Sequence, residues 1–304
     1  MSRTWVRGVW RLADPRLTLA SLSSMGLGAA AAARAGPLDG GWLAMCVGGI
    51  VALEIAKNAS GEIADFDSGT DLAVEPEDRS PFSGGRRVLV DRLLTRGETR
   101  RISLATYGLG IVLGLAIACF REWRVIPLGV AGAGLAWCYG APPIRLAYRG
   151  VGELAVAAVY GPLICGGTYL VQRHAFPWSI VWLSLPLGLL IAGFLWINEF
   201  PDYRADLGTG KLNLVVRLGR ARAARAFAVI LAAAFALQAF LPLLAEPRGV
   251  WLGLAALPLA VAAARRTIAA PENVARLVPA QAWTLQCFTL LAAATAAGLL
   301  WSRA

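Results

Sequence analysis

The sequence contains few charged residues for its length, and this scarcity restricts the class of protein. Of the 304 residues only 16% are charged, 57% are hydrophobic, and the mean hydropathy is +0.59. A soluble globular domain carries about 25% charged residues. The composition therefore argues against a water-soluble domain and is typical of a polytopic membrane protein.

Histidine and paired cysteine are also scarce. His174 is the only histidine, which argues against a histidine-based metal or catalytic cluster. The five cysteines lie inside or at the edges of apolar segments, and none has CxxC spacing. Neither a zinc site nor a disulfide framework is therefore indicated. A compact signal peptide is also lacking, because residues 1–15 interleave arginine and tryptophan. This pattern predicts an interfacial amphipathic segment ahead of the first span.

Long apolar segments are abundant, and their number predicts the fold. A membrane-crossing helix needs about 20 mostly apolar residues. We therefore expect an all-α membrane bundle of nine transmembrane helices that forms a single domain over residues 1–304. The predicted spans are 16–34, 40–62, 102–120, 124–141, 151–171, 178–200, 222–245, 249–268 and 280–301.

The distribution of cations predicts the orientation. A net charge of +10 would also suit nucleic acid, but most of the 29 lysines and arginines fall on one side of the predicted bundle. The positive-inside rule explains such a bias, so no nucleic-acid partner is expected. We expect a bacterial inner-membrane protein with its N-terminus in the cytoplasm and its C-terminus on the opposite side. The two long polar loops, 63–101 and 201–221, would then both be cytoplasmic and are predicted to carry the active site.

The second loop begins with regularly spaced polar side chains. Asn198, Asp202 and Asp206 follow i, i+4, i+8 spacing, which lines one face of a helix. Stacked carboxylates repel each other unless a cation lies between them. Mg²⁺ commonly binds one or two carboxylates together with substrate phosphates. The alternative is a solvated helix end without a ligand.

The first loop repeats this arrangement. Glu54, Asn58, Glu62 and Asp65 follow i, i+4, i+8, i+11 spacing, and Asp71 comes shortly after them. Two acidic faces on the second and sixth spans would thus lie on the same side of the membrane. Basic residues follow each of them, as expected where a diphosphate is bound through Mg²⁺ and neutralised by Arg and Lys.

These motifs resemble those of the UbiA superfamily of intramembrane prenyltransferases, whose members carry two Asp-rich motifs on a nine-helix bundle. NEFPDYRAD (198–206) matches the second motif without a gap. GEIADFDSGTD (61–71) resembles the first motif of the 1,4-dihydroxy-2-naphthoate prenyltransferase branch, as do YGAPPIRLAYRGVGE (139–153) and GKLNLVVRLG (210–219). One departure is that Gly61-Glu62 stands where that branch has Asn-Asp. We therefore expect a usable but altered metal site.

The resemblance implies transfer of a polyprenyl group from its diphosphate to a small aromatic acceptor, inside membrane lipid and with Mg²⁺ as cofactor. It also implies roles for particular residues. Those assigned to the metal are Glu62, Asp65, Asp71, Asp202 and Asp206; those assigned to the diphosphate are Lys57, Asn58, Arg79, Arg145 and Lys211; Asn198 contacts ligand, and Tyr139 or Tyr148 faces the carbocation or the acceptor.

Three alternatives stay open from the sequence. A relative of the same fold could cyclise the prenyl diphosphate without an acceptor. A secondary transporter would also carry intramembrane ionisable residues, although here they gather at one membrane face and not at the midplane. A CDP-alcohol phosphotransferase is also membrane-embedded and Mg²⁺-dependent, but its Asp-Gly-containing signature is absent.

Overall fold

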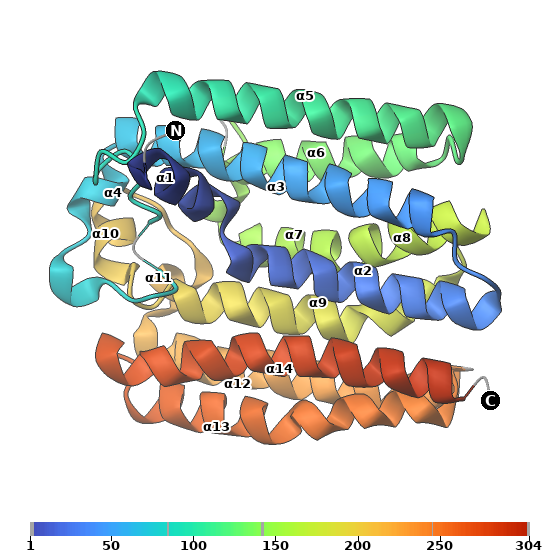
Figure 1. The fold of residues 1–304 in the computed structure, drawn as a ribbon. Coiled ribbons are helices and arrows are strands. Elements are labelled where there is room, and N and C mark those ends of the chain that lie inside the picture. The colour runs from blue at the N-terminus through green and yellow to red at the C-terminus, as the bar shows by residue number, and fades with distance from the viewer. Residues whose placement is uncertain (1–2, 84, 141–142, 245, 303–304) are drawn as a thin grey trace.

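The structure, a computed structural model, describes residues 3–83, 85–140, 143–244 and 246–302. Within these ranges the regular secondary structure is helical, without a strand. The long helices lie side by side along one direction, and short helices gather at one end (Figure 1). An all-α bundle is thus confirmed for the described residues.

The helices follow one another along the chain, mostly with short connections, and the longest connection runs from Ala73 to Arg96. Those of the N-terminal half are α1 (Arg3–Ala13), α2 (Pro15–Ala35), α3 (Gly40–Asp67), α4 (Thr70–Ala73), α5 (Arg96–Phe120) and α6 (Val125–Gly140). Those of the C-terminal half are α7 (Gly152–Ala158), α8 (Ile164–Arg173), α9 (Trp178–Asn198), α10 (Tyr203–Gly208), α11 (Leu214–Leu218), α12 (Arg220–Phe240), α13 (Leu257–Ala269) and α14 (Val274–Trp301). A π-helical turn, η3 (Val159–Leu163), joins α7 to α8, and a 3₁₀ segment, η5 (Arg248–Ala256), precedes α13.

Seven helical segments among the described residues are long and apolar enough to cross a membrane. They are Gly40–Asp67, Arg96–Phe120, Gly152–Arg173, Trp178–Asn198, Arg220–Leu244, Arg248–Ala269 and Val274–Trp301. The helix α6 is apolar but shorter, and α2 contains serines and glycines that lower its hydropathy. Every predicted span coincides with a helix, but the predicted number of nine membrane crossings is not confirmed.

Several predicted boundaries are wrong because polar caps, and not the apolar segments, decide where helices end. The first loop is shorter than 63–101, since α3 continues to Asp67 and α5 already begins at Arg96. Thr95 starts α5 with a capping box, in which Glu98 N donates to its side chain and Glu98 accepts from its backbone. Such a cap satisfies otherwise unpaired N–H groups several residues before the apolar segment begins.

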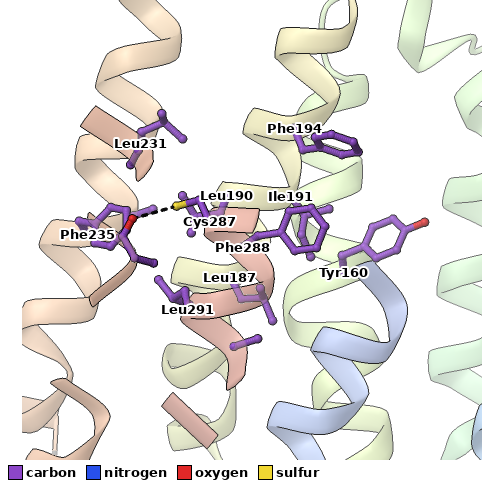
Figure 2. Packing of buried hydrophobic residues seen from close by; sticks show 14 of the residues in the cluster. Tyr160, Leu187, Leu190, Ile191, Phe194, Leu231, Phe235, Cys287, Phe288 and Leu291 are labelled. Atoms are coloured by element: carbon purple, nitrogen blue, oxygen red, sulfur yellow. Dashed lines mark hydrogen bonds between the residues drawn. The ribbon is translucent and has the colours of Figure 1, made fainter. Parts of the chain in front are cut away.

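The main apolar core joins both halves of the chain. Phe194 of α9 packs edge-on against Phe288 of α14, with ring centroids 5.6 Å apart. Figure 2 shows these rings beside Tyr160 and the leucines of α9. On the other side of α14, Cys287 donates to the carbonyl of Ala256 at 3.5 Å. This packing holds α9, and therefore the second acidic motif, firmly within the bundle.

Large apolar side chains remain exposed on the outer helices. Examples are Val112 (62% exposed) and Phe120 (80%) on α5, Val130 (68%) on α6 and Val229 (67%) on α12. Exposure of so many apolar groups would be unfavourable in water, whereas lipid accommodates it. The chain is therefore an integral membrane protein.

Close helix contact depends on glycine at one crossing. A Cβ atom at Gly188 of α9 would lie 2.5 Å from the carbonyl oxygen of Ala157 and 3.1 Å from Cα of Gly161. Both atoms belong to the backbone of the α7–η3 segment, so neither can move independently. Small residues allow such approach between membrane helices.

Substitution Gly188→Val is expected to separate α9 from α7 and to destabilise the protein by about 1–3 kcal/mol, as overpacking generally does. Thermal unfolding of the purified protein in detergent would show a lower Tm. The matched control is Gly114→Val on α5, where nothing lies within 4 Å of the added Cβ. Equal Tm values for the two variants would contradict this account of the crossing.

Candidate active site

Both acidic motifs lie at the same end of the bundle, although more than 100 residues separate them. Figure 1 shows α1, α4, α10 and α11 gathered there, whereas α14 ends at the opposite end. The first motif occupies the end of α3 and the second follows α9. This convergence is what the sequence analysis predicted.

Asn58 of the first motif connects three parts of the chain. Its Nδ2 donates to the carbonyl of Leu12 at 2.9 Å, and its Oδ1 accepts from Nη2 of Arg86 at 2.8 Å. Arg86 also lies 3.5 Å from the carboxylate of Asp14. The side chain of Asn58 is buried and both of its polar atoms have a partner, so it positions Arg86.

Glu62 and Asp71 are buried in different ways. Glu62 Oε1 accepts from the backbone N–H of Leu89 at 2.8 Å and thereby ties the loop to α3. Asp71 lies against Gly85, where φ is +77° and where an added Cβ would overlap the Asp71 carboxylate. Burial, followed by repulsion from Asp65 and Glu62, raises the pKa of Asp71 to about 7. Its Oδ2 has no hydrogen-bond partner among the described residues.

The second motif is not one helical face, and this prediction is wrong. Helix α9 ends at Asn198 and α10 begins at Tyr203, with turns between them. Pro201 lies in this break and has no N–H with which to continue α9. Asn198, the last residue of α9, accepts at Oδ1 from Nε2 of Gln281 of α14 at 3.0 Å. It supports the bundle, while Asp202 stands at the start of α10 and Asp206 lies within that helix.

Asp206 is the best-connected carboxylate of the second motif. Its Oδ1 lies 3.2 Å from Lys211 Nζ, and its Oδ2 accepts from Asn213 Nδ2 at 2.8 Å. Asn213 in turn caps α11 through the N–H of Val216. Burial raises the pKa of Asp206 against the lowering effect of Lys211. The motif is thus held in place by its own loop.

Lys211 links the two motifs. Burial alone would lower its pKa, but Asp206, followed by Tyr139, Asp202 and Glu199, raises it above its ordinary value. The ammonium also lies within electrostatic reach of Asp65 on α3. Lys211 is therefore a charged cation between the carboxylates of α3 and α10.

The other predicted cations are distributed differently. Lys57 lies within electrostatic reach of Arg86, on the bundle side of the first motif. Arg79 is exposed and donates twice to the carbonyl of Val74, and Arg145 is exposed over the ring of Tyr148. Neither is brought to the carboxylates.

Arg86 is the cation that the sequence analysis did not select. Its half-buried guanidinium reaches the first motif through Asn58, and its charge acts on Glu62, Asp65 and Asp71. Its position in Gly-Gly-Arg-Arg, directly after the first acidic segment, was the available signal. Spacing alone could not distinguish it from Arg79.

Two glutamates were also missed. Glu153 at the start of α7 and Glu199 directly after α9 are both buried, at 4% and 6% exposure. Tyr139, a predicted site residue, lies near both of them and near Lys211. Its ring packs against Gly152, where a Cβ would lie 3.0 Å from Cε2. Tyr139 therefore lies close to these two glutamates and to Lys211.

The fit of Mg²⁺ depends on how these carboxylates are grouped. Within the part of the chain that the structure describes, no three of them converge as a closed metal cluster. The orphaned Oδ2 of Asp71 and the mutual repulsion of Asp65, Glu62 and Asp71 nevertheless indicate a surplus of negative charge. Mg²⁺ uses few protein carboxylates when phosphates complete its shell, so this donor set fits such an ion.

Comparison with known sequences supports one family. Residues 21–285 match the UbiA prenyltransferase family. A 1,4-dihydroxy-2-naphthoate octaprenyltransferase of Mycobacterium tuberculosis is 32% identical over 86% of this chain and 84% of its own. The enzyme of that name from Escherichia coli is 28% identical over 77% of this chain and 75% of its own.

Solved structures have the same fold. A UbiA homolog from Aeropyrum pernix superposes with a TM-score of 0.71 at 19% identity, covering 91% of this chain and 96% of that one. A UbiA homolog from Archaeoglobus fulgidus, bound to GPP and Mg²⁺, has a TM-score of 0.60 at 16% identity and covers 95% and 99%. The extent of these matches, together with two acidic motifs at one end of an apolar helix bundle, shows that the chain is a member of the UbiA prenyltransferase family.

Proposed function

We propose that this protein transfers a polyprenyl group from prenyl diphosphate to an aromatic acceptor such as 1,4-dihydroxy-2-naphthoate, with Mg²⁺. The observation that carries the proposal is the meeting of Asp65 and Asp206, from opposite halves of the chain, around Lys211. The names of the relatives supply the acceptor class. A prenyl diphosphate fits this arrangement because its anionic head can bind Lys211, Arg86 and Mg²⁺ and its apolar tail can lie among the apolar helices.

Membership of a prenyltransferase family leaves the secondary transporter and the CDP-alcohol phosphotransferase without support. The seven apolar segments, with α2 and α6, would make nine crossings. We place the acidic end and the N-terminus in the cytoplasm of a bacterial inner membrane, with the C-terminus opposite. In this arrangement 1–15 is interfacial, and 63–101 and 201–221 contain the active-site loops of a single domain.

Each group of residues would have a separate part in the reaction. Asp65, Asp71, Asp202 and Asp206, with Glu62 close by, would hold Mg²⁺, which when bound neutralises diphosphate charge. Arg86, Lys57 and Lys211 add positive charge that stabilises the departing diphosphate. Tyr139 lies where its ring can face the allylic cation. The apolar bundle excludes water, so the cation meets the acceptor and not a hydroxyl from solvent.

Transfer in membranes containing the protein would test the proposal. Labelled geranyl or longer prenyl diphosphate and Mg²⁺ would be supplied with 1,4-dihydroxy-2-naphthoate, 4-hydroxybenzoate, homogentisate or no acceptor. The expected product is a prenylated aromatic compound that forms only with an acceptor. A cyclic hydrocarbon formed without any acceptor would establish the cyclase instead. Prenyl diphosphate that stays unconsumed with folded protein would refute the proposed function.

The raised pKa of Asp71 predicts a pH-dependent affinity for Mg²⁺. Below about pH 7 this carboxyl holds a proton, which Mg²⁺ must displace. Apparent affinity should therefore increase by up to about tenfold per pH unit up to pH 7 and level off above it. Calorimetric titration of Mg²⁺ with a non-hydrolysable prenyl diphosphate at several pH values would measure this. Asp71→Asn should flatten the dependence; an unchanged profile would contradict this role of Asp71.

A further inference from the structure

Glu153 and Glu199 form a carboxyl pair that the proposed mechanism does not use. The two side chains come from α7 and from the residue after α9, and their carboxyl groups lie within hydrogen-bonding reach of each other. Oε2 of each has no hydrogen-bond partner within the described ranges. Burial, followed by repulsion from Glu153, raises the pKa of Glu199 well above its ordinary value, as expected for a carboxyl group buried beside another.

The surroundings of the pair are well defined. Glu153 Oε1 accepts from the N–H of Leu214 at 3.1 Å, which connects α7 to the second active-site loop. The titratable groups that face Glu199 are Glu153, Lys211, Asp206 and Tyr139. Lys211 is the cation among them, and it is already bound to Asp206. Among the groups that face Glu199, the pair therefore has no cation of its own.

Two carboxyl groups without a cation favour a hydrogen-bond donor over an anion as their ligand. A diphosphate is repelled by unpaired carboxylates, and the cations Arg86 and Lys57 lie with the first motif. A buried carboxylate oxygen without a partner instead attracts a hydrogen-bond donor. A phenolic hydroxyl is such a donor, and ionising it makes the aromatic ring a stronger nucleophile. General bases of this kind contribute about 10²–10⁴-fold to rate.

We infer that the Glu153–Glu199 pair accepts the hydroxyl proton of a phenolic acceptor, an inference that rests on the proposed prenyl transfer. The acceptor O–H bond breaks, and its proton joins a carboxylate oxygen of the pair. The aryloxide passes electrons into the ring, and a ring carbon bonds to the allylic carbon. The allylic C–O bond breaks, and its electron pair leaves with diphosphate. The ring carbon then loses a proton to diphosphate, or carbon dioxide where it bears a carboxylate.

Glu199→Gln tests the inference because it preserves shape and hydrogen bonding but removes the acidic group. Transfer would be measured in membranes with 1,4-dihydroxy-2-naphthoate and with 4-hydroxybenzoate and its 3-fluoro derivative, whose hydroxyl is more acidic. We expect kcat to fall about 100-fold with an unchanged KM for prenyl diphosphate. The deficit should shrink at higher pH and with the fluorinated acceptor. Glu246→Gln, at the other end of the bundle, is the control and should keep wild-type rates.

A structural role would give a different result. In that case Glu199→Gln would lose activity equally with both benzoates and at every pH, or would lose none. Either result would show that the pair is not the base and would overturn the inference. Transfer by the wild type would still support the proposed function. A wild-type protein that prenylates no acceptor would overturn the proposed function as well. Should Glu199→Gln fail to fold, Glu153→Gln provides a second variant, since glutamine can still accept from Leu214.

Discussion

Replacing Asp206 with asparagine is expected to reduce prenyl transfer by about 100-fold or more. Asparagine has nearly the same shape, but its one carbonyl oxygen can accept from Lys211 or from Asn213 and not from both, which should cost about 1–3 kcal/mol in stability. The substitution removes the negative charge that would hold Mg²⁺ and that pairs with Lys211. Losing one such electrostatic interaction costs about 3–4 kcal/mol, and each 1.36 kcal/mol is tenfold in rate. The measurement is turnover of labelled prenyl diphosphate in membranes with matched amounts of protein.

Asp67→Asn is the matched control for this experiment. Asp67 belongs to the same acidic region but is exposed and pairs with Arg96 at 2.6 Å, away from the carboxylates. Exposed ion pairs contribute only about 0–1 kcal/mol to stability. We therefore expect near wild-type transfer. If Asp67→Asn and Asp206→Asn lost the same activity, simple loss of acidic charge would explain the result and the site described for Asp206 would be wrong.

Arg86→Gln is expected to raise KM for prenyl diphosphate by about 10-fold to 100-fold. Hydrogen bonds to charged groups contribute about 1.5–3 kcal/mol, and the guanidinium of Arg86 donates to Asn58 of the first motif. Arg86→Lys should recover part of the loss, because it restores the charge but not the planar fork. Initial rates at varied prenyl diphosphate would separate KM from kcat.

Arg79→Gln makes the comparison decisive. Arg79 is close to Arg86 in sequence and also follows the first motif, but its guanidinium donates to the carbonyl of Val74 and is exposed. Its loss should leave KM within about twofold of wild type, as expected for most surface substitutions. A larger effect at Arg79 than at Arg86 would show that the loop is arranged differently when diphosphate binds.

Much of the fold could be predicted because lipid imposes strong local rules. Apolar length predicted where helices lie, and the acidic spacing placed two motifs at one end of the bundle. The helix ends were predicted less well, since caps such as Thr95 lie outside the apolar segments. The helical face proposed for Asn198 failed for a related reason. Pro201 interrupts the helix after Asn198. The partner of Asn198 is Gln281, some 80 residues away in the sequence.

The sequence by itself determined the membrane class, the all-helical fold and the chemical types present at the site, because composition and periodicity act within a single segment. Only the tertiary structure decided which charges meet. It brought Arg86 to Asn58, Lys211 between Asp206 and Asp65, and Glu153 to Glu199. These pairings join residues from separate helices, and local pattern carries no information on distances that the packing of the whole bundle sets.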